Sequence, residues 1–171
     1  MPQVDYTNAK GLDFITSKSF SAVSSTDIDN CFSASYSQYK IITLVTGSND
    51  VGLGIQLKTG GTIYSTGNQR RQYTFADSTS LTSGRETTAT RLTVGVLTTN
   101  VESCGIVEIM NPFQSTPTTL ISAYSFRPIG SIIYEYNTGG IPGTDAFDGF
   151  RLLPTSGTIT GEIYVYGYVN S

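Results

Sequence analysis

The sequence of 171 residues contains no histidine and no tryptophan. The absence of histidine excludes Ser-His-Asp and Cys-His catalysis and removes the commonest side-chain ligand of transition metals. The glycines of VGLGIQ alternate with apolar residues inside an expected strand and no helix follows, so they form no phosphate-binding loop. We therefore expect a protein that is not an enzyme and that binds no cofactor and no metal.

Charged residues are also scarce, at 13% of the chain, and the formal net charge is −3. The basic residues are scattered, with Arg70–Arg71 as the one adjacent pair. A protein that binds duplex nucleic acid normally carries a basic stripe, so we expect no nucleic-acid partner. No apolar run approaches the ~20 residues that span a bilayer, and MPQVDYTNAKGLDF lacks the features of a secretory signal. These absences predict no membrane association and assembly in a cytoplasm.

The two cysteines, Cys31 and Cys104, are far apart in the sequence. They are too few for a zinc site of ordinary composition. A disulfide would need an oxidising compartment and two nearby Cα atoms. We predict two free, buried thiols, since unpaired cysteine behaves as a small apolar residue.

What the chain has instead is serine, threonine and 18 glycines. Threonine favours strands, whereas serine and glycine favour turns, so this composition predicts an all-β protein. Short apolar or alternating runs separated by turn residues indicate a sandwich or a barrel. The expected strands are Phe20–Val23, Ile28–Phe32, Tyr39–Thr46, Val51–Leu57, Arg70–Phe75, Arg91–Leu97, Ser103–Met110, Thr118–Phe126, Ser131–Asn137, Phe147–Leu153 and Glu162–Val169.

Three segments do not read as strands. Residues 1–13 are polar and aperiodic and predict an extended N-terminal arm before a single domain over residues 14–171. Asp77–Thr90 is rich in serine and threonine and predicts a surface connection, and Asn137–Gly143 predicts a glycine-rich turn. Periodicity alone leaves open whether the domain is a jelly roll or an immunoglobulin-like sandwich.

The last quarter of the chain is the most informative, reading DAFDGFRLLPTSGTITGEIYVYGYV. Its two expected strands are predicted to form a closing hairpin around Pro154, Ser156 and Gly157. In the second strand, an aliphatic row lies opposite a tyrosine row because strand side chains alternate between faces. The aliphatic row is Ile163, Val165 and Val169, and the tyrosine row is Tyr164, Tyr166 and Tyr168.

This segment resembles the end of small jelly-roll modules in tailed-bacteriophage virion proteins, with their pattern YDGF-x-L-x-P-s-x-G-t-i-t-G-x-i-x-V-Y-G-Y. GLDFITSKSF and FSASYSQYKIITL are similar to the opening strands of the same modules. The resemblance implies an all-β, two-sheet antiparallel jelly-roll sandwich with an extended N-terminal arm. It also implies a place in the virion, assembled in the host cytoplasm, and offers no catalytic residue to carry over.

Tyrosine couples a flat apolar ring to a polar tip, so exposed tyrosines suit three roles: cross-strand packing, a subunit interface or a platform for sugar rings. Tyr134 and Tyr136 share one face of their strand, as do the three tyrosines near the C-terminus. The arm would contribute apolar anchors to a neighbouring subunit. The candidate interface is therefore Val4, Tyr6, Leu12, Phe14, Tyr134, Tyr136, Tyr164, Tyr166 and Tyr168.

Carboxylate pairs offer little chemistry. Asp27 and Asp29 share a face if their segment is extended, but neither this pair nor Asp145 and Asp148 has the spacing of a glycosidase pair. Asp145 and Asp148 are read as solvated turn residues, with calcium binding as the alternative. Two expected loops, around Arg85–Glu86 and Asp145–Asp148, are the candidate sites for a glycan.

Two functions follow from the resemblance. The first is a non-enzymatic decoration or cement protein that binds the outside of the particle as a homotrimer, with itself and phage capsid or tail proteins as partners. The alternative is a tail-fibre or appendage module that recognises host surface polysaccharide. A lectin-like domain outside a virus is a third, weaker reading.

Overall fold

The computed structural model describes residues 11–67, 69–76, 79–126 and 133–169. These residues form strands and connections without any helix, so none of them belongs to a helix that could cross a membrane. The strands are β1 (Leu12–Val23), β2 (Thr26–Ile28), β3 (Gln38–Gly47), β4 (Val51–Thr59), β5 (Thr62–Ile63), β6 (Gln69–Ala76), β7 (Leu81–Ala89), β8 (Leu92–Leu97), β9 (Glu102–Met110), β10 (Thr118–Phe126), β11 (Ile133–Ile141), β12 (Gly149–Pro154) and β13 (Ile159–Tyr168).

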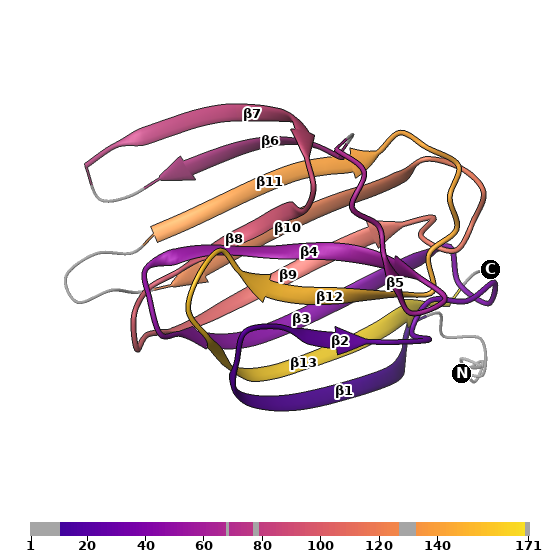
Figure 1. The fold of residues 1–171 in the computed structure, drawn as a ribbon, viewed down its shortest axis with the longest axis horizontal. Helices are drawn as coiled ribbons and strands as arrows, with labels where there is room; N and C mark the ends of the chain where they lie inside the picture. The colour runs from indigo at the N-terminus through magenta and orange to yellow at the C-terminus, as the bar shows by residue number, and fades with distance from the viewer. Residues whose placement is uncertain (1–10, 68, 77–78, 127–132, 170–171) are drawn as a thin grey trace, which may run out of the picture.

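The strands form two antiparallel sheets of unequal width. The larger sheet has eight strands in the order β1-β13-β3-β9-β10-β11-β6-β7. The smaller sheet has the order β2-β12-β4-β5, and β8 also pairs with β4. Figure 1 shows the smaller sheet in front of the larger one, with β6 and β7 extending past its edge. The predicted all-β, two-sheet antiparallel sandwich is therefore confirmed.

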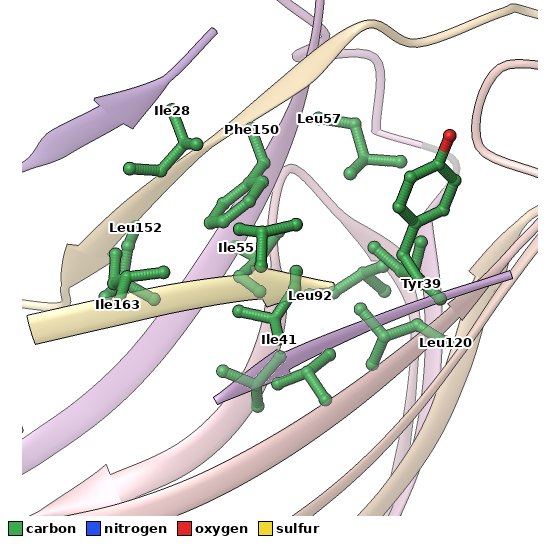
Figure 2. Close-up of a cluster of buried hydrophobic side chains, with 14 of the residues drawn as sticks. Ile28, Tyr39, Ile41, Ile55, Leu57, Leu92, Leu120, Phe150, Leu152 and Ile163 are labelled. Atoms are coloured by element: carbon green, nitrogen blue, oxygen red, sulfur yellow. The ribbon is translucent and has the colours of Figure 1, made fainter. Parts of the chain in front are cut away.

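The core lies between the two sheets. Strand alternation turns one face of each strand inward, and the inward positions carry the large apolar side chains. On β3, Tyr39, Ile41 and Val45 are fully buried. They face side chains from the smaller sheet, as Figure 2 shows for Ile55, Leu57, Phe150 and Leu152, among others. This shared core fixes which face of the larger sheet is left outside.

The prediction that Asp77–Thr90 is a surface connection is wrong. Residues 81–89 of this segment form β7, which pairs with β6 at the edge of the larger sheet. Most of its residues are exposed on both faces, so the segment has no reason to alternate apolar and polar residues. Its strand character comes from backbone pairing and from threonine, and hydrophobic periodicity cannot detect it.

The prediction of a turn over Asn137–Gly143 is also wrong, because β11 continues to Ile141. The glycines remain in the strand because the neighbouring strands approach closely. A Cβ atom on Gly140 would lie 2.4 Å from the carbonyl oxygen of Thr118, and one on Gly139 would lie 2.6 Å from that of Arg70. These glycines therefore mark close strand packing.

The two strands near the C-terminus do not form the predicted hairpin. Strand β12 pairs with β2 and β4 in the smaller sheet, whereas β13 pairs with β1 and β3 in the larger sheet. Both strands turn apolar side chains inward, so they face each other across the core, as Leu152 and Ile163 do in Figure 2. An alternating pattern is the same for strands that pair edge to edge and strands that pack face to face.

The N-terminal boundary of the sheet lies at Leu12, where β1 begins. Leu12 and Asp13 pair with Tyr168 and Gly167, so these two residues of the expected arm belong to the sandwich. Gly11, just before the strand, accepts a hydrogen bond from the backbone N–H of Val169 at 3.1 Å, and residues 1–10 of the arm lie outside the described residues. The expected strand Phe20–Val23 is the last third of β1. The expected strand Ile28–Phe32 is wrong beyond Ile28, because β2 covers Thr26–Ile28 and residues 29–32 are not in a strand.

Gly161 provides a test of the packing between β13 and β3. Its φ is +155°, and a Cβ atom there would lie 2.0 Å from the carbonyl oxygen of Leu44. We expect Gly161→Ala to lower the free energy of unfolding by about 2 kcal/mol or more, measured by denaturant unfolding. Gly11→Ala is the control, since nothing lies within 4 Å of that position; equal effects of the two substitutions would contradict the packing described.

Candidate functional site

The outer face of the larger sheet, turned away from the smaller sheet, carries Phe14 and the exposed tyrosines. Leu12 and Phe14 of β1 stand opposite Tyr168 and Tyr166 of β13. The rings of Phe14 and Tyr166 meet edge to face at 5.7 Å. We call these four residues the edge patch. Phe14 is 59% exposed and Leu12 is 41% exposed, so the patch leaves large apolar side chains in water at a sheet edge.

Acidic residues hold the tyrosine tips in the patch region. The Tyr168 hydroxyl donates to Oε1 of Glu108 at 2.6 Å, and Gln38 Nε2 donates to Oε2 of the same carboxylate at 3.0 Å. Lys40 Nζ lies 3.4 Å from Glu108 Oε1. Burial and the bond to Glu108 raise the pKa of Tyr168. On the same strand, the Tyr164 hydroxyl bonds to Glu162. The hydroxyl groups of Tyr164 and Tyr168 therefore have partners within the chain, which restricts the orientation of their rings.

The structure divides the predicted interface residues into two groups. Tyr164, Tyr166 and Tyr168 lie on the outer face of β13, as expected. Val169 follows the strand and is 38% exposed, so its predicted place in the aliphatic row is wrong. Val4 and Tyr6 lie outside the described residues.

Tyr134 and Tyr136 form the second group, on the outer face of β11. They are 44% and 39% exposed. Three strands separate β11 from β13, which places them about 19 Å away at roughly 4.8 Å per strand. One compact binding surface therefore cannot be built from all the predicted tyrosines.

The two predicted glycan loops do not form a common site, and one of them is not a loop. Arg85 and Glu86 lie within β7 rather than on a loop, because β7 pairs with β6 over this stretch. They line a hollow of about 500 Å³ that does not include Asp145 or Asp148. Glu86 Oε1 accepts a hydrogen bond from Arg71 at 3.1 Å.

Asp145 and Asp148 lie in the connection between β11 and β12. Oδ2 of Asp148 accepts a hydrogen bond from the Gly60 backbone N–H at 2.7 Å, which ties this connection to the turn after β4. Asp145 is exposed. Within the described part of the chain, no three or more acidic, cysteine or histidine side chains gather in a way that could hold a metal ion.

Asp27 and Asp29 do point the same way, and they form an ion cluster. Lys58 is buried, and its Nζ lies 2.8 Å from Asp27 and 2.5 Å from Asp29. Arg151 donates to both oxygens of Asp27, at 2.6 and 2.9 Å. The hydrogen bond from Arg151 is the main cause that holds the pKa of Asp27 well below its usual range. The cluster joins β2, β4 and β12, so we assign it to stability.

The two cysteines are free, but only one is buried. Cys31 is buried, and burial strongly raises the pKa of its thiol. Cys104 is exposed, so the prediction of two buried thiols is wrong for this residue. It occupies an outward position on β9, between the buried neighbours Ser103 and Gly105. Cys104 is exposed because buried and exposed residues alternate along β9 and it falls on the outward set. A cysteine taken alone does not indicate which face of a strand it occupies.

Sequence reasoning predicted Arg85 as a candidate glycan residue but missed two of its neighbours. Arg70 and Gln72 lie on the outer face of β6, next to Arg85 of β7. The adjacent basic pair was the available signal, but its meaning depends on β7 being a strand.

Compared with known proteins, the chain matches no protein-family model and no curated protein.

The two thiols provide a labelling test of the outer face. We expect a thiol reagent such as DTNB to modify Cys104 quickly in the native protein and Cys31 only after denaturation, because a buried thiol of raised pKa is a poor nucleophile. Cys104→Ser should abolish the fast reaction. Equal native reaction rates for the two thiols would contradict the burial described.

The ion cluster predicts a pH dependence of stability. A carboxylate with a lowered folded-state pKa stabilises fully above its unfolded pKa of about 4 and loses this contribution as the pH falls further. We expect Asp27→Asn to lower the free energy of unfolding by about 1–2 kcal/mol at neutral pH and by less at strongly acidic pH. Denaturant unfolding across this range measures both values.

Asp145→Asn is the matched control, because Asp145 is exposed and has no hydrogen bond or ion pair to a described residue. It should change stability little at any pH. A penalty for Asp27→Asn that stays constant from neutral to acidic pH would contradict the assigned role of its charge.

Proposed function

We propose that this protein is a structural protein of a tailed-bacteriophage virion. In this role it is a non-enzymatic decoration or cement subunit that binds the outside of the particle as a homotrimer. Its fold would be the jelly-roll form of the sandwich, and its partners would be copies of itself and phage capsid or tail proteins. The resemblance of its opening strands and of residues 145–169 to phage jelly-roll modules supports the setting.

The edge patch is the observation that carries the proposal. Phe14 and Leu12 keep large apolar areas in water although the chain has a well-filled core. Burying such side chains against another surface yields roughly 25 cal/mol per Å² of apolar area. Aromatic residues in a fixed orientation also lose little side-chain entropy on binding and are typical interface anchors.

The position of the patch suits a contact between subunits. Strand β1 is an edge strand of the larger sheet, so one side of its backbone has no strand partner among the described residues. An exposed strand edge with apolar side chains favours pairing with another chain. In this proposal the expected N-terminal arm extends the contact onto a neighbouring subunit.

The proposed assembly predicts the effect of one substitution. We expect the purified protein to be oligomeric at micromolar concentration and Phe14→Arg to weaken self-association by about tenfold or more, because a charge would replace the anchoring ring. Sedimentation velocity or light scattering after size exclusion measures the oligomeric state. The variant should keep its fold, since Phe14 is largely exposed.

Leu81→Arg is the matched control. Leu81 is 74% exposed at the opposite edge of the sheet, on β7. It should leave self-association unchanged. Rebinding of each variant to phage particles stripped of this protein tests attachment separately. A wild-type monomer at micromolar concentration that also fails to rebind would overturn the proposal.

A further inference from the structure

A continuous groove crosses the outer face of β11, β6 and β7. It consists of two adjoining hollows of about 500 and 530 Å³. Both hollows are lined by Gln72, Arg85 and Thr138, with Arg70 in the first and Tyr136 in the second. We call these five residues with their intervening backbone the arginine groove.

Strand register explains the order of side chains along the groove. Thr138, Gln72 and Arg85 lie in one row across the three strands. Tyr136 belongs to the row on one side, and Arg70 faces Gly140 in the row on the other side. Gly140 has no side chain, so the floor is low between longer neighbours. Four residue steps from Tyr136 to Gly140 give the groove a length of about 14 Å.

The groove holds positive charge that the chain does not neutralise. Among the described residues, Arg70 and Arg85 have no carboxylate partner. Arg71 also borders the first hollow, but its side chain points inward and forms ion pairs with Glu86 at 3.1 Å and Glu135 at 3.3 Å. Lys40, Lys58 and Arg151 also have acidic partners. Arg70 and Arg85 thus place two guanidinium groups without an acidic partner on neighbouring strands, in a chain of net charge −3.

We infer that the arginine groove binds an acidic polysaccharide, with carboxylate groups of successive sugars against Arg70 and Arg85. The guanidinium fork matches a carboxylate with two parallel hydrogen bonds. Tyr136 is 39% exposed and offers a ring on which a sugar can stack. Gln72 and Thr138 provide an amide and a hydroxyl between these points, which suit sugar hydroxyl groups.

The position of the groove favours a saccharide over an acidic peptide. A bound peptide in extended form gains much of its affinity from main-chain hydrogen bonds at a free strand edge. Here β11 and β6 are both interior strands, with partners on each side, so their backbone groups are already paired. The free backbone edge of β7 lies on the side away from β6, so over β11 and β6 the groove offers side-chain contacts alone.

The groove and the edge patch lie at opposite ends of the larger sheet. Binding by the groove therefore goes beyond the proposed attachment role and does not depend on it. A subunit fixed through its β1 edge would keep β6 and β7 turned away from that contact.

The test is binding of short acidic oligosaccharides to the full chain, with oligogalacturonate and oligosialic acid as probes and neutral galactose oligomers for comparison. Calorimetric titration should detect the acidic probes and not the neutral ones. We expect Arg70→Ala and Arg85→Ala each to weaken binding by about tenfold, and added salt to weaken it as well. Tyr136→Ala should weaken it by about fivefold.

Two matched controls lie close by. Arg91 also has no acidic partner among the described residues but lines a different hollow, so Arg91→Ala should leave affinity unchanged. Tyr134 shares the outer face of β11 but does not line the groove, so Tyr134→Ala should also have no effect. Absence of binding to every acidic probe, equal weakening by Arg91→Ala, or equally tight binding of a polyglutamate peptide would each overturn the inference. Self-association measured on the same samples reports separately on the edge patch.

Discussion

The main constraint on this structure is that two sheets of unequal width pack around one hydrophobic core. The smaller sheet covers the inner face of the larger one most fully under β13, β3 and β9, where Ile41, Val107 and Val165 are fully buried. Towards β11 and β6 the inner face becomes polar. Ser122 and Asn137 donate to the carbonyl of Val94 on β8, at 2.8 and 3.3 Å. Hydrogen bonds thus replace apolar packing where the facing sheet ends.

The same mismatch separates the roles of two adjacent arginines. Arg71 turns inward and lies with Glu135, whose pKa is raised by burial. A buried charge of this kind is expensive to leave unpaired, so Arg71 is committed to the fold. Arg70 turns outward, where no such requirement applies. Alternation along one strand therefore assigns one guanidinium to stability and leaves its neighbour available for binding.

The sequence was sufficient to locate strands that have one face in the core and the other in a more polar environment. Tyr39–Thr46 and Val51–Leu57 were predicted to within two residues, because one face of each meets the core. Strand β7 could not be found in this way, since both of its faces meet water. The glycines of β11 were misread because a turn and a close strand contact favour the same residue.

Pairing was harder to predict than strand position. The pattern over residues 147–169 located β12 and β13 but could not show that they lie in different sheets. The candidate site was predicted in part for a similar reason. The tyrosines of β13 were identified correctly as outward residues, whereas the arginine groove needed the register of three strands, two of which hold no hydrophobic signal on that face.

The location of β13 has a consequence for how the chain matures. This strand lies between β1 and β3, so β1 cannot find its sheet partner until β13, far along the chain, has been synthesised. Such distant contacts carry a high entropic cost and slow folding. Until β13 is available, the apolar side chains of β1 would stay uncovered, so this side of the larger sheet would be completed after its other strands.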